Sequence, residues 1–404
     1  MTEEHLVSRR LMLGAAGGLS LAANWPRAAA AGSPLPAKVL SVTQFGAVGD
    51  GRADDTAALQ AALRAAFAHG GTMLELPPGD YRVTAPLRVE LSAGTSGNIT
   101  RHAGIRAHGA RIVSEIADHG DVLSFASTAT VRYLIIEGLA IAGSGREGNG
   151  LVFTSDGRGA YLYNIALRDI VVEGCGGDGC VLFGNVFESQ VFNSYFRDNR
   201  GNGMTFSHGV NGGILSAIHV FGCVFGQNGQ QGAALLRGCY DVSFNGCYFL
   251  LNGCGFENNH VSAKLSQPGN AAIRLVGFGT LLACGAYSVM HQMALIDALV
   301  TGELVMIGCR GFGDATAKGA GLGRFAGTGA GRATLIGCQG AVERDGGFEP
   351  LEIAGEVGMR FGSNWQSRSL PQLGEYRLWV DQRGRLRIKR GAPASDEDGS
   401  VVSQ

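Results

Sequence analysis

A short motif recurs through the centre of the chain and constrains its fold more than any other feature. Each copy has Gly-Cys or a close variant, an aromatic residue two positions later, and then Asn. The aromatic position, filled by Ile or Val in looser copies, falls at residues 112, 141, 172, 196, 225 and 249, at spacings of 24 to 31 residues. A period of this length, with short alternating strands and Gly turns, is typical of a solenoid.

Each repeat is too short for a helix and a strand but long enough for three short strands. We therefore predict an all-β fold, a right-handed parallel β-helix over residues 38–362, in which equivalent positions stack about 4.8 Å apart. The stacking predicts three ladders: Phe196, Phe225 and Phe249; Cys223 and Cys247; and Asn199, Asn228 and Asn252. The asparagines are expected to join one rung to the next and to be structural.

Composition excludes several other classes of protein. The 65 Gly residues follow no three-residue period and Pro is scarce at 10, which excludes collagen. A hydrophobic share of 45% with 17% charged residues excludes a disordered chain. The net charge of −1 predicts no nucleic-acid partner. No apolar run reaches the roughly 18 residues of a membrane span, so we expect no membrane partner either.

The first 31 residues have the features of an export signal. Arg9 and Arg10 precede a weakly apolar stretch, and Ala28–Ala31 follow it. This resembles a bacterial twin-arginine signal peptide, and it predicts a periplasmic or secreted protein. A short surface helix that carries Arg-Arg is the alternative. Because that pathway exports folded proteins, folding would occur in the reducing cytoplasm, where free buried thiols are the simpler expectation for the nine cysteines.

A second resemblance begins at residue 42. Val42–Gly51, Asp54-Asp55-Thr56, Gln60 and Pro77–Tyr81 resemble the N-terminal signature of the pectate-lyase-like superfamily, which includes rhamnogalacturonase-like, epimerase and tailspike-like proteins. The resemblance implies the same β-helix and a polysaccharide partner, since members cleave, epimerise or bind polysaccharides.

The same segment predicts a capping helix. Its apolar face consists of Leu59, Ala62, Leu63, Ala66 and Phe67. Asp54 or Asp55 would cap its start, and Gly70-Gly71 would end it. Such a helix would cover the open end of the strand stack, so we predict that the two aspartates are a cap and not a catalytic pair.

Candidate site residues follow from the strands that come after the Asn turns. Gly150, Gly179, Gly203, Gly232 and Gly255 are each expected to open one such strand. Residues one and three positions later point inward, and those two and four positions later point outward. The strands then end at a stacked column of Ser155, Gly184, His208, Arg237 and His260. This alignment brings together His208, Arg237 and His260, with Glu257 beside them.

These side chains suit chemistry on a uronate. Arg237 could neutralise the carboxylate, His208 or His260 could remove the C5 proton, and Glu257 could act as acid or base. Asp178 resembles one carboxylate of the Gly-Asp-Asp-Cys turn of polygalacturonase-like hydrolases, but Gly179 replaces the second. Because inverting hydrolysis needs two carboxylates about 6.5–9.5 Å apart, elimination or epimerisation is favoured slightly. The alternative for the whole column is that its side chains cap turn carbonyls.

The sequence therefore predicts a polysaccharide lyase or glycoside hydrolase. Its predicted catalytic residues are His208, Arg237, Glu257, His260 and Asp178. Apolar outward residues such as Val152, Val181 and Phe183 favour the alternative, a non-catalytic glycan-binding or surface protein. No dense Asp run resembles a calcium loop, so we predict no cofactor and no metal, with calcium, which some relatives use, left open.

Residues 375–404 are predicted to form a separate C-terminal unit. Tyr376–Asp381 and Arg385–Lys389 alternate around a turn at Arg383-Gly384, which is typical of a hairpin. The segment is similar to the closing segment of tailspike-like proteins, which implies a cap or a subunit contact and suggests a homotrimer. Arg387-Ile388-Lys389 also spells a motif of polygalacturonase-like hydrolases, but its place in a terminal hairpin favours coincidence.

Overall fold

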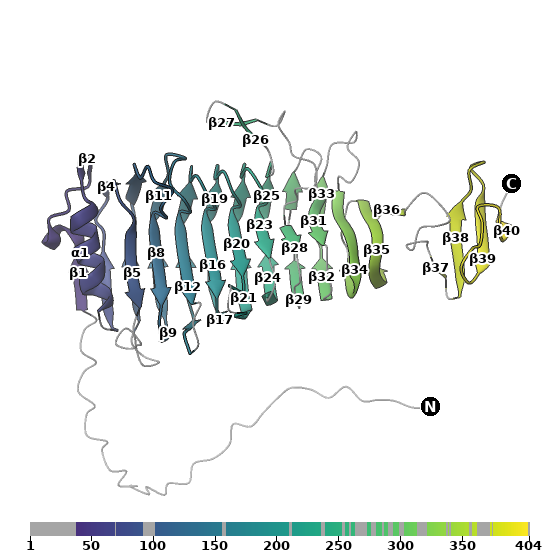
Figure 1. The fold of residues 1–404 in the computed structure, drawn as a ribbon, viewed down its shortest axis with the longest axis horizontal. Coiled ribbons are helices and arrows are strands. Elements are labelled where there is room, and N and C mark those ends of the chain that lie inside the picture. The colour runs from purple at the N-terminus through teal and green to yellow at the C-terminus, as the bar shows by residue number, and fades with distance from the viewer. Residues whose placement is uncertain are drawn as a thin grey trace, which may run out of the picture. The chain divides into compact units, whose positions relative to one another are not determined.

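The computed structural model describes residues 38–402 with internal gaps. The gaps are residues 69, 92–101, 156–158, 210–211, 236–238, 253–254, 258–259, 263–272, 276–279, 285–286, 290–293, 299–302, 313–320, 337, 339–340, 355–357, 362–371 and 374. The predicted export signal therefore lies outside the described residues. Strands of successive turns pair in parallel, and the fold is the predicted all-β right-handed parallel β-helix (Figure 1).

One turn of the chain shows how a rung is built. Strands β12 (Leu151–Ser155), β13 (Tyr161–Tyr163), β14 (Ala166–Arg168) and β15 (Val171–Glu173) follow one another, and β16 (Cys180–Gly184) then pairs in parallel with β12. We call the four successive positions rows A, B, C and D. Rows A, B and C belong to one 24-stranded sheet, and row D is a separate ten-stranded sheet.

The remaining strands extend these rows. Row A also contains β5 (Leu87–Leu91), β8 (Leu123–Ser127), β20 (Met204–Ser207), β23 (Ala233–Leu235), β28 (Ile273–Leu275), β31 (Ala294–Ala298), β34 (Gly321–Ile336), β35 (Ala341–Ala354) and β36 (Gly358–Phe361). Row B also contains β9 (Thr130–Arg132), β17 (Val186–Phe187) and the first residues of β21 (Leu215–Phe221) and β24 (Cys239–Asn245).

Rows C and D run beside them. Row C also contains β1 (Lys38–Ser41), β3 (Thr72–Glu75), β6 (Ala103–Arg106), β10 (Leu134–Glu137), β18 (Gln190–Phe192), β29 (Thr280–Cys284), β32 (Glu303–Ile307) and the later parts of β21, β24, β34 and β35. Row D also contains β2 (Asp50–Asp54), β4 (Gly79–Val83), β7 (Ala110–Ser114), β11 (Ala140–Ala142), β19 (Tyr195–Arg197), β22 (Val224–Gly226), β25 (Tyr248–Leu250), β30 (Tyr287–Val289) and β33 (Arg310–Phe312).

The predicted aromatic position is a single inward column of row D. Its members are paired from rung to rung in the order Ile112, Ile141, Val172, Phe196, Phe225 and Phe249. Phe225 stacks on Phe196 with ring centroids 5.5 Å apart and on Phe249 at 4.8 Å, and all three rings are fully buried. The aromatic position of the repeated motif therefore lies in the core of the solenoid, as predicted.

The asparagine ladder is also confirmed. Asn199, Asn228 and Asn252 are fully buried at the turn between rows D and A. The Nδ2 group of Asn199 donates to Oδ1 of Asn228 at 3.0 Å, and Nδ2 of Asn228 donates to Oδ1 of Asn252 at 2.7 Å. Asn228 also donates to the Phe196 carbonyl at 2.9 Å. Each buried amide thereby joins two rungs, and none of this column is available for catalysis.

Glycine precedes the row-A strands β12, β16, β20 and β23, at turns where there is little room for a side chain. A Cβ atom on Gly203 would lie 2.5 Å from the Gly232 carbonyl oxygen and 2.9 Å from Nδ2 of Asn228. On Gly179 it would lie 2.7 Å from the Gly203 carbonyl oxygen. The glycines thus allow the asparagine ladder to pass between successive turns.

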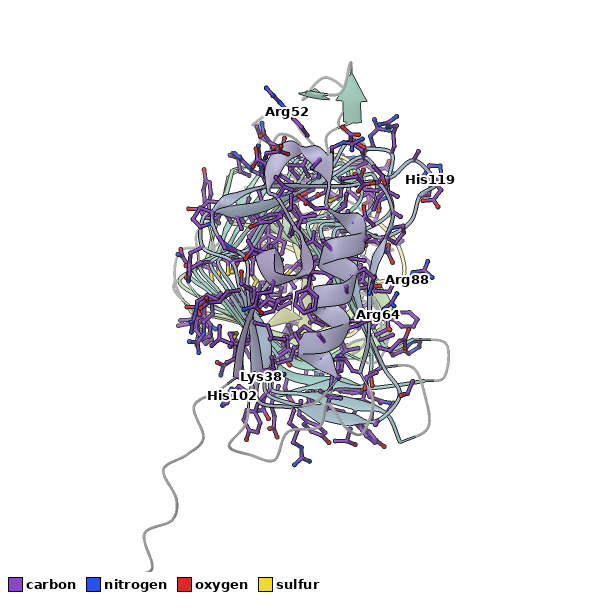
Figure 2. The ribbon with its side chains drawn as sticks, turned by 90° about the vertical axis from the view of Figure 1, so that its left-hand side faces the viewer. Lys38, Arg52, Arg64, Arg88, His102 and His119 are labelled. Carbon is purple, nitrogen blue, oxygen red and sulfur yellow. The ribbon has the colours of Figure 1, made fainter. Side chains whose placement is uncertain are left out.

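The predicted capping helix is α1 (Thr56–Phe67), which follows a 3-10 turn at Val42–Phe45. All five residues of its expected apolar face are buried. Figure 2 looks at the N-terminal end of the solenoid and shows α1 lying across it. The Gln60 side chain accepts from the Arg88 N–H at 2.9 Å and donates to the Arg88 carbonyl at 2.7 Å. It thereby satisfies backbone groups of β5, the first strand of row A.

The two aspartates before α1 are structural, but their carboxylates bind different partners. Asp55 occupies the N-cap position without a side-chain cap bond, and its carboxylate accepts instead from Val48 N–H at 2.7 Å and Gly49 N–H at 3.0 Å. Asp54 accepts from the Thr56 N–H at 3.1 Å and from the Thr84 hydroxyl at 2.7 Å. Asp54 therefore joins the helix start to the next rung.

Buried cysteines line the interior, and the seven that the structure describes are free thiols. Cys223 and Cys247 stack at the turn between rows C and D, one rung apart as predicted, and their neighbour on the preceding rung is Ser194. Burial raises the pKa of the Cys180 thiol, which keeps it protonated and unreactive.

A buried carboxylate anchors the loop between β11 and β12. Glu147 is 1% exposed and accepts from the N–H groups of Ser144, Gly145 and Gly176, each at 3.0 Å. Burial by itself would raise the pKa of Glu147, but these bonds and that from the Ser144 hydroxyl outweigh it and hold the pKa below its ordinary value. The residue is thus an ionised structural bridge between two turns.

The C-terminal segment forms a four-stranded sheet. It contains β37 (Gln372–Leu373), β38 (Tyr376–Val380), β39 (Leu386–Arg390) and β40 (Ser400–Val401), and the predicted hairpin corresponds to β38 and β39. Arg387 is 6% exposed, and its Nε donates to Asp381 at 2.6 Å, so this arginine is structural as expected.

Candidate functional site

A polar ladder runs along the outer edge where row D turns into row A. Its members are Asp121, Asn149, Asp178, Asn202 and Gln231. The side chain of each accepts from the backbone N–H of the next, at 2.9, 2.8, 2.7 and 2.9 Å in order. This edge therefore carries a continuous line of carboxylate and amide groups across five turns.

Asp178, a predicted site residue, belongs to this ladder. Its Oδ1 accepts from the Asn202 N–H at 2.7 Å, and its Oδ2 accepts from the Thr205 hydroxyl at 2.6 Å. Asn202 in turn donates to Thr205 at 3.0 Å. Both carboxylate oxygens are thus occupied by the following rung, which gives Asp178 a bridging position at the edge.

The predicted column of strand-end residues is only partly correct. Ser155 pairs with Gly184, and His208 follows directly after the pair Phe183 and Ser207, so the first three members stack as expected. Arg237 lies outside the described residues. The next row-A partner of Ala233–Leu235 is Ile273–Leu275, not residues 256–258, so His260 does not stack above Arg237.

Residues 255–262 leave the rows and form a hairpin of their own (Figure 1). Its strands are β26 (Gly255–Glu257) and β27 (His260–Ser262), which pair in antiparallel register. The prediction failed here because Asn252-Gly253 is followed by another Gly, as at the true strand openings, although the pairing strand comes some twenty residues later. Glu257 and His260 therefore lie in this hairpin and not in row A, and they are register partners there.

His208 lies on the inner side of its strand. Met204 and Phe206 are fully buried on the inner side of β20, and strand alternation puts His208 on that same side. Its Nδ1 is buried and has no hydrogen-bond partner among the described residues. The outward residues Val152, Thr205 and Ala234 are only 5%, 8% and 3% exposed, whereas Val181 and Phe183 are partly exposed, so the outer surface of row A is covered in part.

Sequence reasoning missed a polar network on the outer side of row C. His219 Nδ1 lies 2.8 Å from the Ser243 hydroxyl, which also accepts from Asn245 Nδ2 at 3.1 Å. Register pairs Gln190 with His219 and His219 with Ser243. The sequence did contain a signal for this network. Gln190, His219 and Ser243 each stand four positions before a member of the repeated motif, namely Ser194, Cys223 and Cys247.

Aromatic rings flank this network, but they stack on one another. Phe192 and Phe221 lie 5.0 Å apart with planes 9° apart, and Tyr163 and Phe187 lie 5.1 Å apart. The Arg168 guanidinium lies 5.8 Å from the Phe192 ring centre. Since the ring faces contact each other, the surface presents ring edges, and these stacks support the rungs more directly than they support sugar stacking.

Two further chemical features bear on the site. Among the described residues, no three His, Cys, Asp or Glu side chains are grouped so that they could hold a metal ion. In the same part of the chain, no helix has the length and apolar character needed to cross a membrane.

Family models match both ends of the chain. Residues 39–110 match the model described as rhamnogalacturonase A/epimerase, pectate lyase-like, which covers the segment where we noted that resemblance. Residues 352–404 match the model of a capsule depolymerase.

Curated relatives match more than half of the chain. Mannuronan C5-epimerase AlgE5 of Azotobacter vinelandii is 30% identical over 274 residues, which is 58% of this chain and 26% of that protein. Mannuronan C5-epimerase AlgE2 of the same organism is 30% identical over 258 residues, 54% of this chain and 24% of that protein. The chain thus spans about a quarter of the length of these relatives.

Among solved structures, ORF18 of Geobacillus virus E2 shares the fold. It superposes with a TM-score of 0.57 at 16% identity and covers 88% of this chain and 68% of its own.

Proposed function

We propose that the protein is an enzyme that modifies a uronate-containing polysaccharide, with C5 proton removal as the first chemical step. The observation that carries the proposal is the alignment with mannuronan C5-epimerases across more than half of the chain, on a β-helix scaffold. A base takes the C5 proton while a cation stabilises the adjacent carboxylate. The carbanion either expels the sugar linked at C4, leaving a double bond, or regains a proton on the opposite face.

The best-supported catalytic pair is Glu257 and His260. The backbone register of the β26–β27 hairpin places Glu257 directly opposite His260. A carboxylate and an imidazole brought together in this way can act as an acid and base pair. Arg237 is proposed as the cation that faces the uronate. Asp178, before the start of β16, and His208, after the end of β20, are proposed in supporting roles.

The experiment incubates the full-length protein, in D₂O, with polymannuronate, polygalacturonate and a neutral polysaccharide. Ultraviolet absorbance of unsaturated uronate, with new reducing ends, indicates a lyase, because C5 of the unsaturated residue carries no hydrogen. Deuterium without absorbance, with inversion at C5, indicates an epimerase. New reducing ends with neither signal indicate hydrolysis and would overturn the C5 mechanism.

Variants locate the chemistry. Glu257→Gln and His260→Gln are each expected to lower the rate of C5 proton removal, read as deuterium incorporation or as unsaturated uronate, at least a hundredfold, the size of a lost acid or base. His108→Gln is the matched control, because His108 is an exposed histidine on another part of the solenoid. Unchanged activity in both hairpin variants would exclude this pair.

A second candidate is a non-catalytic glycan-binding or surface protein. The covered, largely apolar outer side of row A at Val152 and Ala234 favours it, because catalysis there needs accessible polar groups. Binding of polysaccharide by isothermal titration, with no deuterium incorporation, no unsaturated uronate and no new reducing ends on any substrate, would decide for this candidate.

Export and assembly are proposed on sequence grounds. The twin arginines Arg9 and Arg10 favour translocation to the periplasm or beyond. Lys at both positions should retain the protein in the cytoplasm of a bacterial host. The tailspike-like C-terminal segment favours a homotrimer, which light scattering of the purified protein can test.

A further inference from the structure

One inward column of row A carries an unusual run of polar groups. It consists of Leu91, Ser127, Ser155, Gly184 and His208, each stacked on the one before. Such a column normally holds apolar side chains, as the neighbouring inward column of Phe125, Phe153, Leu182 and Phe206 does. The column therefore places hydroxyl and imidazole groups inside the solenoid.

Two atoms of the column have no hydrogen-bond partner among the described residues. They are Oγ of Ser155, a residue that is fully buried, and Nδ1 of His208. A buried polar atom without a partner is rare in folded proteins because it loses its hydration and gains nothing in return. Ser127, one rung earlier, is different, since its hydroxyl donates to the Ala129 carbonyl.

Both unpartnered atoms flank the same glycine. Ser155 and His208 lie one rung before and one rung after Gly184, so their Cα atoms are about 9.6 Å apart, twice the strand spacing. Gly184 adds no side chain between them. The backbone of Gly213 packs closely against Gly184 and His208. A Cβ on Gly213 would lie 2.7 Å from the Gly184 carbonyl carbon and 2.8 Å from the His208 carbonyl oxygen.

We propose that this corner is a binding site for ordered water that joins Ser155 Oγ to His208 Nδ1. Water is the occupant of fitting chemistry, because it donates and accepts, and the hydroxyl and the ring nitrogen each need a partner of that kind. No residue of the column carries a permanent charge, so the site does not call for an ion. About one or two molecules span the separation.

The site has a consequence for His208, which rests on the proposed function. With Nδ1 engaged inside the solenoid, Nε2 is the ring nitrogen that remains for contact with substrate. Ser155 is then a positioning residue, because it acts on the imidazole through water and does not touch the polysaccharide. The same column thus fixes the orientation of a proposed active-site histidine from behind.

The test compares Ser155→Ala with Ser127→Ala, two serine deletions one rung apart in one column. If water joins Ser155 to His208, Ser155→Ala lowers the denaturant midpoint and shifts the His208 side-chain ¹⁵N resonances. Ser127→Ala also lowers the midpoint, because it loses the bond to Ala129, but leaves the His208 resonances in place. A raised midpoint for Ser155→Ala with unchanged His208 resonances would overturn the proposal, since removing a truly unpaired hydroxyl stabilises a protein.

A crystal structure of the unmodified protein gives a second readout that requires no variant to fold. Electron density for water within hydrogen-bond distance of both Ser155 Oγ and His208 Nδ1 is expected. A dry corner, with Ser155 turned to a backbone carbonyl, would contradict the proposal. Neither readout depends on turnover, so a failure of the proposed enzyme activity would be distinguished from a failure of this site.

Discussion

Two regions of the solenoid hold their rungs together in different ways. In the first turns, exposed ion pairs join adjacent strands, as Arg111 joins Asp80 at 2.8 Å and Arg82 joins Glu115 at 2.7 Å. In the central turns, buried neutral ladders do so, as Asn228 does between Asn199 and Asn252. The first kind is screened by salt and weakened by acid, and the second kind is neither.

The difference indicates how a scaffold can work beside a polyanion. A charged polymer and its counterions change the local ionic conditions, which would loosen rungs held by exposed ion pairs. The central turns, which lead to the proposed site, add buried amide, hydroxyl and aromatic contacts to an exposed ion pair between Arg197 and Glu173 at 2.6 Å. Four substitutions test whether the two regions differ in the expected order.

The largest effect is expected from Phe225→Ala. The ring contacts Phe196, Phe249 and Phe244, and its removal leaves a cavity in the middle of the stack. A loss of about 3–5 kcal/mol in the free energy of unfolding is expected. Urea unfolding followed by circular dichroism measures it. The exposed Tyr195→Ala is the control, and an equal loss there would show that the stack is not special.

Asn228→Ala should follow closely. It removes the side-chain acceptor of the Asn199 N–H and Nδ2 groups and the side-chain donor to the Phe196 carbonyl, at a cost of about 2–4 kcal/mol for several lost buried bonds. The matched control is Asn193→Ala, because Asn193 is exposed and bridges to Asp169 at 2.6 Å. If both variants unfold at the same urea concentration, burial of the ladder is not what stabilises the central turns.

Glu147→Gln is expected to lower stability in a manner that depends on pH. The folded pKa of Glu147 is depressed, so its contribution is present above the unfolded value of about 4.5 and is lost as the pH falls through the folded pKa. The difference from wild type should therefore be large at neutral pH, about 2 kcal/mol, and shrink in acid. Unfolding curves from pH 7 to pH 3 measure it. A constant difference over this range would contradict a depressed pKa.

The smallest effect is expected from Arg111→Ala. Both partners of its ion pair are nearly half exposed, so the loss should stay below about 1 kcal/mol and decrease further in high salt. Thermal unfolding at low and high ionic strength measures it. A loss as large as that of Asn228→Ala would remove the distinction between the two regions.

Much of the fold follows from the sequence because stacking copies one local pattern many times. The columns of Phe225, Cys223 and Asn228 are fixed by spacing alone, and an error at one rung is corrected by its neighbours. The apolar face of α1 likewise follows from helical periodicity.

The candidate site was harder to predict because it depends on where the pattern breaks. Gly255 resembles a strand opening, yet the strand that pairs with Ala233–Leu235 begins at Ile273, and local sequence does not say which segment will pair. The position of His208 was within reach, since alternation from Met204 and Phe206 already points it inward. Predicting the network of His219 requires a comparison of equivalent positions on successive rungs, not of neighbouring residues in the sequence.

The position of α1 also affects how the protein is made. Because β1, β2 and α1 precede every other described strand, the ribosome releases the closed end of the solenoid first. Each later turn can then pair with the strands of the turn before it. Only the strands formed last have an unpaired edge that could bind wrong partners. During synthesis in this direction, the turns already folded provide the strands on which the next turn pairs. A pause during translation therefore leaves a shorter solenoid rather than an unfolded chain.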